Sequence, residues 1–150
     1  MIGTGNTSEK NLLDLLVNEL NIRIPKANYI ENEKVIYKNK PWLSVKEVLV
    51  ETNTDEKVLY SKIVRQDFVQ TVLMNNIGSI LLQLRFRIGA KAYVIELPGG
   101  GCEEGENPID SAYRELKEEL EITKINLSPI SSFYLDPMRS SCKGHFFYGR

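Results

Sequence analysis

The strongest structural signal in the sequence is a helix between Asn107 and Leu120. Asn107 is a favourable N-cap residue, and Pro108 fits the first helical position. Asp110 places a negative charge in the first turn, where the helix dipole favours it. Apolar side chains recur at helical spacing and form one stripe, Ile109, Ala112, Leu116 and Leu120. Because Pro98 and three glycines precede this segment, the sequence predicts a strand, a glycine-rich turn and one amphipathic helix.

The rest of the chain is rich in strand patterns, which predicts an α+β fold. A first amphipathic helix is expected over Asn11 to Leu20, with short strands around residues 22–24 and 35–37. We divide the chain into an N-terminal helix and extension, residues 1–40, and a main domain, residues 41–150. The main predicted strands span Leu43 to Glu51, Val58 to Arg65, Phe68 to Met74, Ser79 to Arg85, Tyr93 to Leu97, Ile125 to Tyr134 and His145 to Tyr148.

The composition excludes several classes of protein. A chain of 150 residues with 42% apolar and 26% charged residues is typical of one globular domain. The net charge of -1 provides no positive field to attract a nucleic acid. No stretch is apolar enough to cross a membrane, and the start is not signal-like. We therefore expect a cytoplasmic protein with neither a nucleic-acid nor a membrane partner.

Three glutamates of the predicted helix form an acidic cluster. Glu115, Glu118 and Glu119 lie at positions i, i+3 and i+4, where like charges repel by a few tenths of a kcal/mol per pair. A divalent cation would supply the missing positive charge, and clusters made only of carboxylates suit hard ions such as Mg²⁺ or Mn²⁺. A solvated acidic helix face is the alternative, and the three glutamates alone do not exclude it.

The residues around the cluster resolve this choice. The chain reads Gly100, five residues, Glu106, seven residues, and then Arg-Glu-Leu-Lys-Glu-Glu-Leu-Glu-Ile from Arg114 to Ile122. This segment resembles the signature of the Nudix hydrolase family, G-x5-E-x7-R-E-U-x-E-E-x-G-U, where U is aliphatic. Every fixed position matches except the late glycine, which is Glu121 here. The resemblance implies a Nudix α/β/α sandwich with a mixed sheet and a Mg²⁺-dependent pyrophosphohydrolase.

The resemblance also implies a role for each matching residue. Glu115 and Glu119 correspond to the principal metal ligands, and Glu118 to a third that binds directly or through water. The backbone carbonyl of Gly99 would complete the metal site. Glu106 and Arg114 correspond to a supporting pair that orients the ligands. The bound cations, Mg²⁺ or Mn²⁺, would clamp the pyrophosphate oxygens and acidify the attacking water.

Glu121 is the one departure from the motif. A glycine at this position suits the left-handed C-cap of a helix, where a residue with a Cβ atom is strained. The sequence leaves two alternatives open. Glu121 either lengthens the helix by part of a turn or occupies a different cap. Both affect how the chain leaves the helix more than they affect the metal site.

Segments outside the signature resemble the branch of the family that hydrolyses ADP-ribose and nucleotide sugars. Arg85 lies in a Gln-x-Arg strand end, and Glu96 opens a Glu-Leu-Pro-Gly-Gly entry to the signature. Both correspond to substrate-binding residues, although a surface arginine is the alternative for Arg85. Trp42, the only tryptophan, could stack on a base or simply pack. We interpret His145 as structural.

The resemblance extends to quaternary structure and leaves the function open in one respect. Residues 41–66 match an N-terminal hairpin that builds a homodimer in this branch. Relatives usually continue beyond the position of residue 150, where a loop supplies the glutamate that acts as general base. The principal hypothesis is hydrolysis of a nucleoside diphosphate linked to a sugar. The alternatives are a nucleotide-binding or regulatory domain with little turnover and a hydrolase of modified nucleoside triphosphates.

Overall fold

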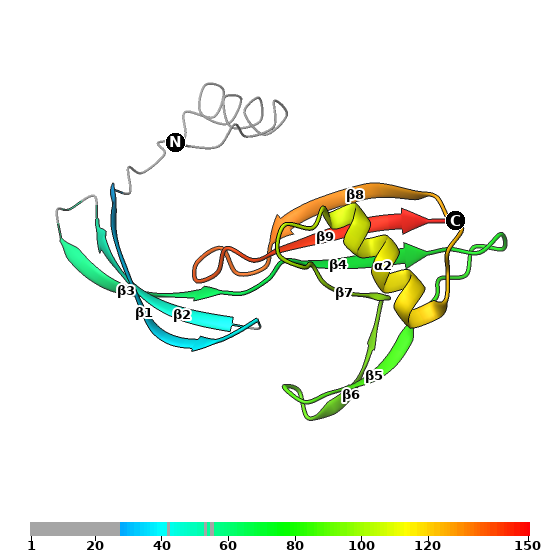
Figure 1. The fold of residues 1–150 in the computed structure, drawn as a ribbon, viewed down its shortest axis with the longest axis horizontal. Helices are drawn as coiled ribbons and strands as arrows, with labels where there is room; N and C mark the ends of the chain where they lie inside the picture. The colour runs from blue at the N-terminus through cyan, green and yellow to red at the C-terminus, as the bar shows by residue number, and fades with distance from the viewer. Residues whose placement is uncertain (1–27, 42, 53, 55) are drawn as a thin grey trace, which may run out of the picture. The chain divides into compact units, whose positions relative to one another are not determined.

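A computed structural model describes residues 28–41, 43–52, 54 and 56–150 of the chain (Figure 1). The chain divides into two compact units, residues 1–32 with 48–60 and residues 33–47 with 61–150. The predicted helix from Asn11 to Leu20, the short strand around residues 22–24 and Trp42 lie outside the described residues. No helix in the described part of the chain is both long and apolar enough to span a membrane.

The N-terminal strands form a three-stranded sheet in the order β1-β2-β3 (Figure 1). Strand β1 spans Asn28–Asn39, β2 spans Leu43–Glu51 and β3 spans Lys57–Val64. The prediction for β2 is confirmed to the residue, and that for β3 is correct to within one residue at each end. The predicted short strand at residues 35–37 is instead a long strand, β1. This region therefore contains three paired strands, not only the two of the expected hairpin.

One carboxylate links these three strands. Glu33 of β1 accepts hydrogen bonds from Lys46 of β2 at 2.6 Å and from Lys62 of β3 at 2.9 Å. All three side chains are partly exposed, so each ion pair contributes little by itself. Their shared acceptor nevertheless favours one alignment of the strands.

The second sheet is mixed and has the order β7-β4-β9-β8. Its central strands, β4 (Phe68–Leu73) and β9 (Lys143–Gly149), are parallel to each other. The outer strands, β7 (Gly99–Gly101) and β8 (Leu127–Tyr134), run antiparallel to their neighbours. The predicted mixed sheet is confirmed. The glycines of β7 were expected to form turns, but pairing with β4 makes them a strand, with Gly100 opposite Val69.

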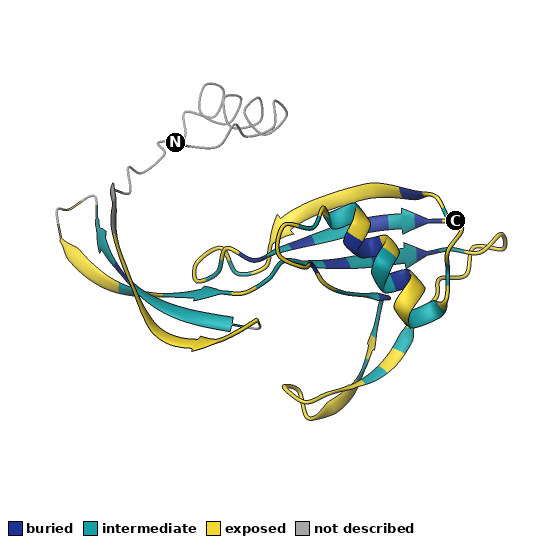
Figure 2. Ribbon diagram, viewed as in Figure 1, coloured by how far each residue is buried: buried dark blue, intermediate teal, exposed yellow. Residues whose placement is uncertain are grey.

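Helix α2, Pro108–Leu120, covers one face of this sheet (Figure 1). The burial of β4 alternates with the strand period, so Val69, Thr71 and Leu73 are buried. Ala112 and Leu116 of the helix are fully buried. The buried residues gather where α2 lies over β4 and β9 (Figure 2). Within the described residues α2 is the only helix, so one helical layer of the expected α/β/α sandwich is observed.

Both ends of α2 are set by local chemistry. The side chain of Asn107 accepts a hydrogen bond from the N–H of Ile109, as an N-cap should. At the other end Glu121 is the C-cap and has the left-handed conformation, with φ of 57°. Its N–H donates to the carbonyl of Lys117, and the N–H of Ile122 donates to the carbonyl of Leu116. The helix therefore ends as if the motif glycine were present, and the alternative of a longer helix is wrong.

Strands β5 (Gln83–Arg87) and β6 (Ala92–Glu96) form a separate antiparallel pair. The predicted strand from Ser79 to Arg85 is placed too early. The side chain of Asn75 accepts hydrogen bonds from the N–H groups of Ile77 and Ser79, which holds that segment in a turn. The strand therefore starts only at Gln83.

Candidate functional site

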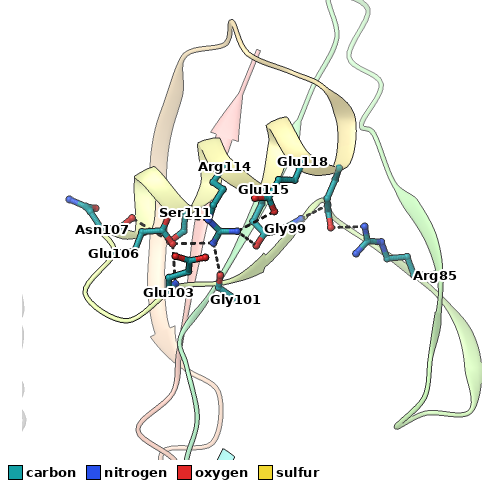
Figure 3. Close-up of polar contacts among 11 residues, drawn as sticks. Arg85, Gly99, Gly101, Glu103, Glu106, Asn107, Ser111, Arg114, Glu115 and Glu118 are labelled. Carbon is teal, nitrogen blue, oxygen red and sulfur yellow. Dashed lines mark hydrogen bonds and ion pairs between the residues drawn. The ribbon is translucent and has the colours of Figure 1, made fainter. Parts of the chain in front are cut away.

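Arg114 is the centre of a polar network between α2, the loop before it and β7 (Figure 3). Its guanidinium donates to both oxygens of Glu106, at 3.1 Å from Nε and 3.0 Å from Nη2. It also donates to the carbonyl of Gly101 at 2.8 Å and to Glu115 at 2.8 Å. A weaker contact of 3.4 Å reaches Glu118. The fixed fork of an arginine matches this set of acceptors, which a lysine could not satisfy together.

Glu106 accepts from three groups. Besides Arg114, the hydroxyl of Ser111 donates at 2.6 Å and the N–H of Glu103 donates at 3.0 Å. The hydrogen bonds from Arg114, followed by those from Ser111 and Glu103, lower the pKa of Glu106 to about 2. The hydrogen bonds to Glu106 likewise raise the pKa of Arg114. The predicted supporting pair is thus in contact, and this network ties the loop before α2 to the helix.

Ser111 is a member of this network that the sequence reasoning missed. It is fully buried, and its hydroxyl is satisfied by Glu106. It falls at one of the positions that the signature leaves free. The only available signal is its location one turn after the N-cap Asn107 and on the same side as Arg114. A serine there looks like an ordinary helix residue until the loop is folded over it.

The three glutamates of the predicted cation site have different surroundings. The side chains of Glu115 and Glu119 are only 12% and 9% exposed, whereas that of Glu118 is 58% exposed. Glu115 contacts Arg114. Glu119 accepts a hydrogen bond from the N–H of Gly99 at 3.1 Å. Glu115 and Glu119 therefore lie against the protein, and Glu118 is exposed to solvent.

Two glycines of β7 allow this close approach. A Cβ atom on Gly100 would collide with the carboxylate of Glu115. A Cβ atom on Gly99 would collide with the backbone carbonyl of Val69, and Gly99 also has a φ of 150°, which side chains rarely adopt. The backbone of β7 is thereby held between β4 and the carboxylates of α2. This position places peptide groups of Gly99 and Gly100 beside the glutamates.

The two arginines of β5 form ion pairs with acidic residues. Arg85 contacts Glu119 at 2.5 Å through Nη2 and lies 3.9 Å from Glu96. Arg87 binds Glu96 more firmly, through Nε at 3.0 Å and a second contact from Nη2. The hydrogen bonds that Arg87 donates to Glu96 raise the pKa of Arg87. Arg85 and Glu96, two of the three predicted substrate-binding residues, are thus close to each other, and Arg85 reaches Glu119 of the helix.

Arg87 was not among the predicted site residues. The pattern Gln83-x-Arg85-x-Arg87 alternates along β5 and places the three side chains on one face of the strand. That alternation was a signal for Arg87. Its partner was hidden, because Glu96 lies opposite Gln83 rather than opposite Arg87 in the register.

The oxygen atoms of this region are of the kind that a hard divalent cation prefers as ligands. Glu115, Glu118 and Glu119 offer carboxylate oxygens, and the backbone of β7 lies next to them. In the part of the chain that the structure describes, however, no group of three or more His, Cys, Asp or Glu side chains is arranged to hold a metal ion. The side chains of Glu115 and Glu119 point to guanidinium groups instead.

His145 lies away from the glutamates. Its Nε2 is 3.1 Å from Asp67, and its Nδ1 is 2.8 Å from the hydroxyl of Ser132. Asp67 also accepts from the N–H of Lys143. These contacts join the start of β4 to β8 and β9, which agrees with a structural interpretation. Both cysteines are free and buried, and burial raises the pKa of the Cys102 thiol.

Comparison with known proteins identifies the domain. Residues 64–148 match the NUDIX domain model. Over 69 residues the chain is 35% identical to an ADP-ribose pyrophosphatase of Bacillus subtilis (strain 168), which covers 46% of this chain but 37% of that protein. The fold matches a crystal structure of an ADP compounds hydrolase with a TM-score of 0.72 and 19% identity, over 85% of this chain and 68% of the other. The chain therefore belongs to the Nudix family, as its signature predicted.

Proposed function

We propose that this protein is a Mg²⁺-dependent pyrophosphohydrolase whose substrate is a nucleoside diphosphate linked to a sugar, such as ADP-ribose. One observation carries the proposal: Glu115 and Glu119 are held against the β7 backbone by the Arg114 network and by Gly99. The ADP-ribose pyrophosphatase relative supports the substrate class, although the chain spans only 37% of that protein's length.

Glu115, Glu119 and Glu118, with the Gly99 carbonyl, would hold the cation, with Mn²⁺ as a substitute for Mg²⁺. When bound, the cation would neutralise the pyrophosphate and lower the pKa of a bound water. Arg114 and Glu106 hold the loop and helix in register, so that the glutamates stay close to β7. This orientation limits the reorganisation that catalysis would otherwise require.

The β5 and β6 pair would form the substrate side of the site. Arg85 provides a guanidinium that can bind a phosphate oxygen, and it is 35% exposed. Glu96 is bound by Arg87, which leaves its carboxylate fixed beside Arg85. A fixed carboxylate can accept hydrogen bonds from the hydroxyls of a ribose or sugar. This pairing of one anion-binding and one hydroxyl-binding group suits a sugar-linked diphosphate better than a simple triphosphate.

A homodimer is the second part of the proposal. Residues 41–66 contain all of β2 and β3, a sheet region with exposed apolar side chains such as Val58 and Leu59. Exposed apolar strands favour association with a second chain. Light scattering at micromolar concentration tests this directly. A particle of twice 17.1 kDa is expected, and a monomer at that concentration would contradict the shared assembly.

A hydrolysis screen tests the activity. ADP-ribose, GDP-mannose, UDP-glucose, NADH and nucleoside triphosphates would be incubated with the protein and Mg²⁺. We expect turnover of the sugar-linked diphosphates, loss of turnover in Glu119→Gln, and no change in Glu104→Gln, a variant of an exposed loop residue. Unchanged activity in Glu119→Gln would contradict the metal assignment.

A nucleotide-binding domain with little turnover is the second candidate. The observation that favours it is the engagement of both inner carboxylates by arginines, Glu115 by Arg114 and Glu119 by Arg85. The same screen separates the candidates when it is combined with calorimetric titration of ADP-ribose. Binding without turnover, in the presence of Mg²⁺, would favour the binding domain.

A further inference from the structure

The carboxylate of Glu119 is engaged on both of its oxygens by groups from outside its helix. Oε2 accepts from the N–H of Gly99 at 3.1 Å, and Oε1 contacts Nη2 of Arg85 at 2.5 Å (Figure 3). The side chain of Glu119 is 9% exposed, so solvent contributes little to its solvation. Arg85 is consequently the principal positive charge that compensates Glu119 in this arrangement.

Arg85 differs in one respect from the other guanidinium at the site. Arg114 also engages a glutamate of the cluster, but it is anchored by Glu106 and by the carbonyl of Gly101. Arg85 has a single close partner, Glu119, because Glu96 is 3.9 Å away and is already bound by Arg87. Arg85 can therefore leave Glu119 without breaking a second strong contact, whereas Arg114 cannot leave Glu115 so easily.

A divalent cation bound at Glu119 would compete with the Arg85 guanidinium for the same carboxylate. A cation that binds Glu119 replaces the compensating charge, and two positive groups at such short distance repel each other. The guanidinium of Arg85 is then displaced while it remains close to the site, since β5 fixes its backbone. It then keeps only the more distant carboxylate of Glu96, 3.9 Å away, which increases its attraction for a phosphate oxygen.

We propose that Arg85 is an exchangeable counter-ion that couples cation binding at Glu119 to anion binding at β5. This inference rests on the proposed function and concerns how its two ligands depend on each other. Without a cation, Arg85 holds Glu119 in place and is itself unavailable to a phosphate. With a cation, Arg85 is released to bind the substrate. By linkage, a phosphate held by Arg85 also favours the cation by the same factor.

The first test is calorimetric titration with Mg²⁺ alone, without any nucleotide. In the wild type, the cation must displace Arg85, so removal of that competitor strengthens binding. We expect Arg85→Gln to bind Mg²⁺ about three- to tenfold more tightly than the wild type, a range suited to a partly exposed ion pair. Arg85→Lys retains the charge and is expected to lie closer to the wild type. Lys91→Gln, in the turn between β5 and β6, removes an exposed positive charge outside the contacts of Glu96 and Glu119 and serves as the control.

A second measurement follows Arg85 itself. The Nε–H resonance of Arg85 would be assigned in ¹⁵N spectra by its loss in Arg85→Lys. We expect it to shift as Mg²⁺ is added, with the same midpoint as the calorimetric titration. The Nε–H resonance of Arg114 should shift much less, because its contacts to Glu106 persist. Far-UV circular dichroism would verify that each variant is folded.

The outcomes separate this inference from the proposed function. Equal Mg²⁺ affinity in the wild type, Arg85→Gln and Lys91→Gln would overturn the counter-ion role, even if Glu119→Gln still weakens the cation and the function stands. An equal gain in affinity in Arg85→Gln and Lys91→Gln would also overturn it, since a general charge effect would then explain the change. If neither the wild type nor Arg85→Gln binds Mg²⁺, both the inference and the metal-dependent function are wrong.

Discussion

The guanidinium of Arg114 and the carboxylate of Glu106 form a two-pronged contact, with Nε 3.1 Å from one oxygen and Nη2 3.0 Å from the other. The two residues are eight positions apart, and one lies in the loop before α2 while the other lies inside the helix. Their contact fixes the loop against the helix. It also leaves Nη1 of Arg114 directed at Glu115, so the geometry of a proposed ligand depends on a pair that need not touch the substrate.

Replacing Arg114 by lysine should show whether the site depends on the positive charge alone or also on the forked geometry of the guanidinium. A lysine keeps the positive charge but cannot donate in a fork to Glu106 while it reaches Glu115 and the Gly101 carbonyl. We expect Arg114→Lys to lower kcat or Mg²⁺ affinity about 10- to 100-fold, as loss of supporting contacts around a metal site does. Steady-state kinetics over a range of Mg²⁺ concentrations would measure this. Lys117→Arg, a change elsewhere on α2, is the control, and equal kinetics in the two variants would contradict the prediction.

Glu106 should make stability depend on pH in the acid range. Its pKa in the folded protein is about 2, below the ordinary value of 4.5, mainly because Arg114 donates to it. The stabilisation is therefore present above pH 4.5 and is lost as the pH falls towards 2. Chemical denaturation at several pH values should show a steeper loss of stability between pH 4.5 and 2 in the wild type than in Glu106→Gln. Parallel curves for the two proteins would disagree with the assignment.

Replacing Glu121 by the glycine of the motif should stabilise the protein. Its φ of 57° is left-handed, which costs an L-residue with a side chain about 1–2 kcal/mol. Glycine adopts this conformation without that strain but loses more entropy on folding, so we expect Glu121→Gly to stabilise the protein by about 1 kcal/mol.

The matched control for this change is Glu121→Ala, which removes the same charge but keeps a Cβ atom. Thermal unfolding of the wild type and both variants would compare them. A gain in Tm confined to glycine is expected. An equal gain with alanine would mean that charge rather than backbone strain is responsible.

A side chain at position 100 should destabilise the protein. A Cβ atom there meets the carboxylate of Glu115, which is itself held by Arg114. We expect Gly100→Ala to lower the free energy of unfolding by about 1–3 kcal/mol, as overpacking does, and to weaken Mg²⁺ binding. Gly89→Ala is the control, because a Cβ atom at Gly89 meets nothing within 4 Å. Denaturant unfolding would compare the two variants, and similar midpoints would show that β7 has room for a side chain at position 100.

The helix and its chemistry could be predicted because their signals are local. The N-cap Asn107, the apolar stripe and the spacing of the glutamates depend on residues within a few turns of one another, and α2 begins as expected. The strands with clear alternation, such as β2, were also correct. The pairing of Glu106 with Arg114 followed from the family signature and is present in the structure.

The errors arose where distant residues decide the local structure. The glycines of β7 look like a turn, and only their pairing with β4 makes them a strand. The segment after Asn75 is apolar enough for a strand, yet the Asn75 side chain holds it in a turn. Residues 28–39 are too polar to predict as one strand by themselves, but they pair with β2.

The sequence by itself determined the family, the helix with its caps and the carboxylates suited to a cation, since these follow from residue type and short spacing. Only the tertiary structure decided which positive groups lie beside the carboxylates. The contact of Arg85 with Glu119 joins residues 34 positions apart, and the burial of Ser111 depends on the folded loop. Neither contact can be read from nearby residues, because ionic and hydrogen-bonding partners are selected by distance in space. That distance is set when the β5 and β6 pair and the loop before α2 fold beside the helix.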